Sequence, residues 1–72
     1  MAEISAQDVG PRAQEALTAS PVFALRDLRV EQRGERLLIS GSVSSFYHKQ
    51  LAQEVVRTVA GKCEVVNSIR VG

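Results

Sequence analysis

One amphipathic segment, residues 46–60, lies between two strand-like segments and constrains the fold more than any other feature. Its apolar residues recur at spacings of three and four, which is the period of a helix that buries one face. They are Leu51, Ala52, Val55, Val56 and Val59. Residues 37–43 and 65–71 read as strands, with alternate residues sharing one face. A strand–helix–strand unit of this kind crosses over with a right hand, so the two strands are expected to be parallel.

Two further elements are expected before this unit. Gly10-Pro11 is typical of a helix start, and Ser20-Pro21 ends that helix because the residue before proline avoids the α region. Residues 27–31 alternate polar and apolar positions, which predicts a strand with one wet face. Arg33-Gly34 then favours a tight hairpin, with a slightly longer loop as the alternative.

The order helix, strand, strand, helix, strand predicts an α+β fold of two layers, αββαβ. We expect a three-stranded mixed sheet with residues 37–43 as the central strand and both helices on one face. The alternative places residues 65–71 beside residues 27–31 as an antiparallel partner. The length of 72 residues allows one domain, expected over residues 11–72. Residues 1–10 lack an apolar pattern and are expected to be a flexible lead-in.

Composition indicates a folded globular domain and offers no constellation of residues for catalysis. The chain is 44% hydrophobic and 24% charged, with a net charge of +1, which is typical of globular domains. Its only histidine is His48 and its only cysteine is Cys63, which excludes an internal disulfide and the familiar zinc clusters. The serines have no neighbouring base and acid to activate them. We therefore expect no catalytic residue, no cofactor and no metal ion, and interpret Cys63 as a small buried hydrophobe.

The glycines and the one asparagine favour structural roles. Gly41 would weaken its strand unless another segment comes close there, and Gly61 is expected to end the long helix in the left-handed conformation. These two glycines form no phosphate-binding motif. Asn67 lies on the inward face of the last strand, where a buried amide needs partners, so it is expected to hydrogen-bond a loop backbone.

Two basic residues, His48 and Lys49, stand in the first turn of helix 46–60, where a cation opposes the helix dipole. Together with free N–H groups and nearby hydroxyls they would form an anion pocket, and a lipid phosphate is one candidate occupant. Aromatic rings beside them suit a head-group interface. The alternative is a solvated turn with Phe46 folded into the core. The candidate anion- or lipid-binding residues are Ser44, Ser45, Tyr47, His48 and Lys49.

The sheet face that the helices leave uncovered is the second candidate site. If residues 37–43 and 65–71 pair, Leu38 and Val66 become neighbours, with arginines around them. Two adjacent aliphatic side chains surrounded by arginines are suited to docking a partner domain. The alternative is an ordinary exposed sheet face with no partner. The candidate interaction residues are Arg29, Leu38, Val66 and Arg70.

Several segments resemble the BON domain, named for bacterial osmotically induced and nodulation proteins. The resemblance covers roughly residues 12–71 and rests on residues 37–45, Ala52, residues 59–61 and the closing residues 65–71. These read Leu-Leu-Ile-Ser-Gly-Ser-Val-Ser-Ser, Val-Ala-Gly and Val-Val-Asn-Ser-Ile-Arg-Val. Two departures from the family are Lys62, where valine is common, and the basic turn described above, where an acid is frequent.

The resemblance implies a non-enzymatic module of the bacterial envelope and stress type that binds phospholipid or other envelope components. The alternative is a protein-interaction or self-association domain that uses the open sheet face. Nucleic acid is not expected as a partner: the element order is similar to KH-type domains, but the chain has no GXXG loop and little net charge. The family leans towards the periplasm, whereas no signal peptide is visible, so we expect a cytoplasmic member or a fragment of a longer protein.

Overall fold

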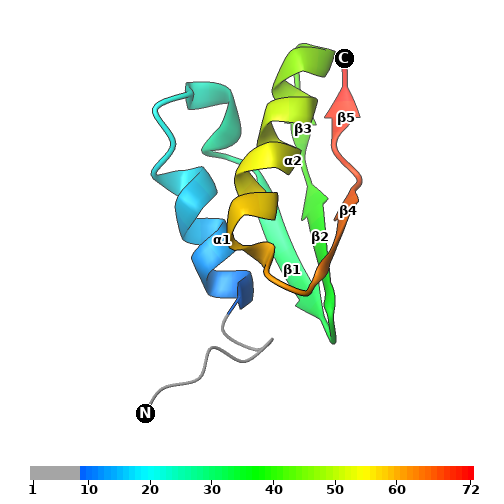
Figure 1. Ribbon diagram of the computed structural model, residues 1–72. Helices are drawn as coiled ribbons and strands as arrows, with labels where there is room; N and C mark the ends of the chain where they lie inside the picture. Colours follow the sequence, from blue (N-terminus) through cyan, green and yellow to red (C-terminus); the bar gives the residue numbers. More distant parts are fainter. Residues whose placement is uncertain (1–8) are drawn as a thin grey trace.

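Two helices pack on one face of a small sheet in the computed structural model, which describes residues 9–72 (Figure 1). Of the predicted lead-in, residues 1–8 lie outside the described residues. For Val9 and Gly10 the prediction is wrong, since both belong to the first helix and are buried. The elements are α1 (Val9–Thr18), the 3-10 helix η2 (Phe23–Leu25), β1 (Arg29–Arg33), β2 (Arg36–Ser40), β3 (Ser42–Val43), α2 (Phe46–Ala60), β4 (Glu64–Asn67) and β5 (Arg70–Val71). This is the predicted α+β, two-layer αββαβ arrangement.

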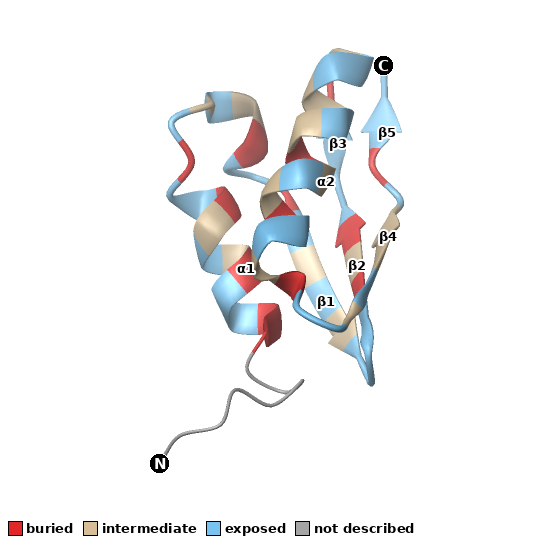
Figure 2. Ribbon diagram, viewed as in Figure 1, coloured by how far each residue is buried: buried red, intermediate tan, exposed pale blue. Residues whose placement is uncertain are grey.

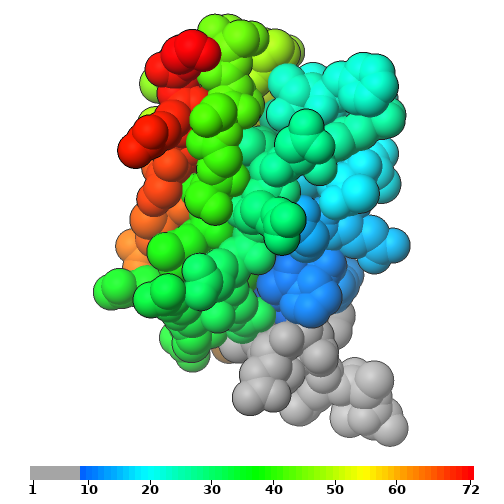
Figure 3. All heavy atoms as spheres, turned by 180° about the vertical axis from the view of Figure 1, so that it is seen from behind, coloured from blue at the N-terminus to red at the C-terminus, as the bar shows by residue number. Residues whose placement is uncertain are grey.

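The sheet has the order β1-β2-β4, with β2 in the centre. β1 pairs antiparallel with β2, and β4 pairs parallel with β2 through the crossover helix α2. Leu38 lies directly across from Val66 in this register. The prediction of a central strand is therefore confirmed, and the alternative with the last strand beside β1 is wrong. Seen from behind, the strands form most of the surface that the helices leave bare (Figure 3).

Both long strands that the sequence predicted are interrupted. Residues 37–43 divide at Gly41 into β2 and β3, and residues 65–71 divide at residues 68–69 into β4 and β5. Gly41 has φ +131°, and a Cβ there would lie 2.7 Å from Leu28 Cδ2. The Arg70 N–H donates to the Gly41 carbonyl at 2.9 Å, so the two neighbouring segments of the chain stay side by side past the interruption. β3 and β5 form a separate parallel pair.

The core lies between the sheet and the two helices (Figure 2). The face of α2 predicted from its periodicity is the buried one: Ala52 and Val56 are fully buried, while Leu51, Val55 and Val59 are half-buried against the core. Buried residues come from every layer and include Val9, Ala13, Leu17, Leu25, Leu28, Leu37, Ile39, Val43, Ala60 and Ile69. Burial of these side chains is the main force that holds the two layers together.

The turns differ in detail from the sequence interpretation. The hairpin loop consists of Gly34 and Glu35, because Arg33 still pairs with Arg36. Gly34 has φ +60° in the first loop position, which is where a type II′ turn requires glycine. Gly61 ends α2 as predicted, but with φ 60° and ψ −119° it lies outside the left-handed helical region.

Candidate functional site

Side chains at the start of α2 hydrogen-bond to its own first turn. Ser45 is the N-cap: its Oγ accepts a hydrogen bond from the His48 N–H at 3.2 Å and lies 3.0 Å from His48 Nδ1. Ser44 is exposed, and His48 and Lys49 are half-buried. The candidate residues therefore lie together at one helix start, but the Ser45 hydroxyl is already used in a hydrogen bond that caps the helix. Within residues 9–72, His48 Nε2 and the Lys49 amine form no hydrogen bond or ion pair.

Every aromatic residue of the chain is exposed. The sequence contains two Phe, one Tyr and no Trp, and the exposed fractions are 80% for Phe23, 66% for Phe46 and 68% for Tyr47. The alternative that folded Phe46 into the core is therefore wrong. η2, the first turn of α2 and the end of β5 lie at one end of the molecule (Figure 1). We call this end the aromatic end; it carries Phe23, Phe46, Tyr47 and the 44% exposed Val71.

Basic side chains flank these rings. The Arg26 guanidinium lies 4.6 Å from the centroid of the Phe23 ring, a cation–π contact. The Tyr47 and His48 rings lie 5.6 Å apart. Arg70 on β5 and Lys49 on α2 add two further cations, and Asp27 is the acid next to Arg26 in the sequence. The aromatic end therefore combines exposed apolar rings with an excess of positive charge.

Phe23 and Arg26 were not among the residues that the sequence singled out, since both lie in the short connector after the first helix. Their spacing of three would have indicated a contact on one helical turn.

The open sheet face brings the four predicted interaction residues onto one side. Leu38 and Val66 are cross-strand neighbours and half-buried, and Arg29 and Arg70 are exposed around them. Further charges on this face pair with one another: Arg33 Nε lies 3.1 Å from Glu31 Oε2, and Arg36 Nε lies 3.5 Å from Glu64 Oε1. Exposed pairs of this kind contribute little to stability.

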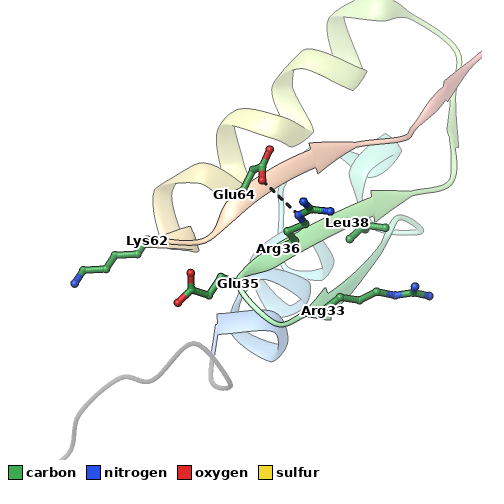
Figure 4. A pocket seen from close by; sticks show the side chains of 6 residues that line it. All are labelled: Arg33, Glu35, Arg36, Leu38, Lys62 and Glu64. Atoms are coloured by element: carbon green, nitrogen blue, oxygen red, sulfur yellow. Dashed lines mark ion pairs between the residues drawn. The ribbon is translucent and has the colours of Figure 1, made fainter.

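A hollow of about 490 Å³ lies at the hairpin end of this face (Figure 4). Its side chains do not converge on a common point: Arg36 turns to Glu64, whereas Lys62 and Arg33 extend away in opposite directions. It is lined by Arg33, Glu35, Arg36, Leu38, Lys62 and Glu64. Within residues 9–72 no three His, Cys, Asp or Glu side chains cluster in a way that could hold a metal ion.

The fold and these surfaces define a small α+β binding module. A family model described as the BON domain matches residues 8–72, and the chain belongs to this family. BON domains are binding domains of the bacterial envelope and stress type and are not known as catalytic. A comparison with curated proteins gave no significant match. In the part of the chain that the structure describes, neither helix is long and apolar enough to cross a membrane.

Proposed function

We propose that this BON domain binds the surface of anionic phospholipid membranes through its aromatic end. The observation that carries the proposal is the exposure of all three aromatic side chains at one end of the fold, beside Arg26, Lys49 and Arg70. A globular domain gains stability when aromatic rings are buried, so an end that exposes all of them has the character of a contact surface. Aromatic rings at the head-group level and cations beside them are the usual components of a membrane contact.

The charges set the expected strength and salt dependence. A basic side chain near an anionic bilayer contributes about 1 kcal/mol, so three of them together would raise the affinity roughly a hundredfold. This attraction falls off within about 10 Å at 0.1 M salt. Binding should therefore weaken steeply as salt is added, while the contribution of the rings remains.

The double variant Phe46→Ser with Tyr47→Ser is expected to lose at least about tenfold in affinity for vesicles of phosphatidylglycerol and phosphatidylcholine, because burial of two rings is worth more than 1.4 kcal/mol. Co-sedimentation with vesicles measures the effect. Neither side chain is buried in the core, so the thermal midpoint should stay close to that of the original protein.

Leu38→Ser is the matched control, since it removes an apolar side chain from the open sheet face instead. The membrane proposal fails if no vesicle composition binds the protein, or if Leu38→Ser loses binding and the double variant keeps it.

A second candidate function, docking of a protein or of a second copy on the open sheet face, is supported by the cross-strand contact between Leu38 and Val66. Leu38→Glu places a charge in the middle of this apolar pair. If the face mediates association, sedimentation velocity should show a complex for the original protein and a monomer for the variant. A protein that is monomeric at all concentrations, and whose Leu38→Glu variant keeps every native partner, contradicts this function.

A further inference from the structure

At the edge of the sheet formed by β1, side chains hydrogen-bond where a further strand could pair. Gln14 of α1 donates from Nε2 to the Leu28 carbonyl at 2.9 Å and accepts the Val30 N–H on Oε1 at 2.8 Å, as a neighbouring strand would do. Gln32 on the same strand accepts the Gly10 N–H at 2.8 Å. Gln14 thus caps the Leu28 carbonyl and the Val30 N–H, and α1 lies along this edge of the sheet, which is a common way to protect an edge.

The opposite edge, formed by β4, has no such cover. The N–H groups of Glu64 and Ser68 each donate at 2.8 Å to carbonyls on the β2 side. Because successive residues of a strand direct their N–H and C=O groups to opposite edges, those of Val65 and Asn67 point outward. They have no partner among residues 9–72. β4 lies at the outline of the molecule in both views, with no other described segment beyond it (Figures 1 and 3).

A hollow of about 380 Å³ runs between this edge and the second half of α2. Near it, the Asn67 amide ties β4 to α2, donating to the Lys49 carbonyl at 3.0 Å and to Gln53 Oε1 at 3.2 Å. Arg57 is its charged lining residue, and no acidic side chain lines it. The lining residues are Gln53, Arg57, Ala60, Gly61, Cys63 and Val65.

We propose that the β4 edge and this hollow together bind an extended acidic peptide by strand addition. The peptide backbone pairs with the outward groups of Val65 and Asn67, and alternate side chains enter the hollow, where a carboxylate meets Arg57. A second copy fits less well than a peptide, because antiparallel pairing of two β4 strands would bring the α2 helices of both copies, which cover the same face of the sheet, against each other.

The test uses the ¹⁵N-labelled protein and a short, capped peptide that alternates valine and glutamate. We expect the amide signals of Val65 and Asn67 to shift and their hydrogen exchange to slow as the peptide is added. A peptide N-methylated at alternate residues on its pairing edge is expected to bind at least about tenfold more weakly, because it has lost the donors for the ladder. A valine–lysine peptide should also bind more weakly.

Arg57→Gln and Arg12→Gln form a matched pair, since both remove one exposed arginine from a helix. Only Arg57→Gln is expected to weaken the valine–glutamate peptide, by a few-fold. The proposal is overturned if the N-methylated peptide binds as well as its parent, if the lysine peptide binds as well as the glutamate peptide, if both arginine variants behave alike, or if the shifts map to Leu38 and its neighbours on the open sheet face.

Discussion

Replacing Gly41 with alanine is expected to lower the free energy of unfolding by roughly 3 kcal/mol, a large part of the stability of a domain this small. Two causes act together. The φ of +131° is one that residues with a Cβ rarely adopt, and the new Cβ would lie 2.7 Å from Leu28 Cδ2, with the Leu28 Cα at 3.5 Å. Leu28 is itself 1% exposed, so it can give way only by disturbing the core.

Urea denaturation followed by circular dichroism measures this change. Gly34→Ala is the matched control because Gly34 also has a positive φ, +60°, but a Cβ there would meet nothing within 4 Å. It should therefore cost only the backbone strain, about 1 kcal/mol. If the two variants are equally destabilised, crowding by Leu28 is not the reason that Gly41 is required.

The case of Gly41 also shows which parts of the fold the sequence could predict. The helix α2, the hairpin and the parallel crossover follow from local periodicity and from the hand of strand–helix–strand units, and the structure has them where they were expected. The two strand interruptions differ in how local their causes are. The glycine at position 41 indicated that another segment should come close, but that this segment is Leu28 depends on the tertiary fold. The interruption after Asn67 is local, since the Asn67 side chain accepts the Ile69 N–H two residues on.

The candidate sites divide in the same way. The role of Ser45 as a cap was predictable because it depends on residues a few positions apart. The contact of Leu38 with Val66 was predictable from the alternation of the strands once the topology was assumed. The exposure of Phe46 and the position of Phe23 at the same end could not be predicted, since they depend on how η2 packs beside α2. A local pattern says which face of an element is apolar, but not which neighbours cover it.

Asn67 joins the two halves of the interrupted strand to α2, and its loss is the second large effect that we expect. Its Oδ1 accepts the Ile69 N–H at 3.1 Å, while its Nδ2 donates to the Lys49 carbonyl and to Gln53 Oε1. Asn67 therefore hydrogen-bonds partly to a loop backbone, as the sequence predicted, and partly to helix α2. The Asn67 side chain therefore links the interruption between β4 and β5 to the first turns of α2.

Asn67→Ala is expected to lower the free energy of unfolding by roughly 2–3 kcal/mol, because it leaves the Ile69 N–H without its acceptor and removes both hydrogen bonds from β4 to α2. The Ile69 amide should also exchange its hydrogen faster than in the original protein. Ser68→Ala is the control, since this exposed neighbour forms only a backbone bond. Because Asn67 also holds α2 against the strand that leads to Val71, the variant should bind anionic vesicles more weakly than Ser68→Ala does. An unchanged exchange rate at Ile69 would show that the amide does not hold this turn.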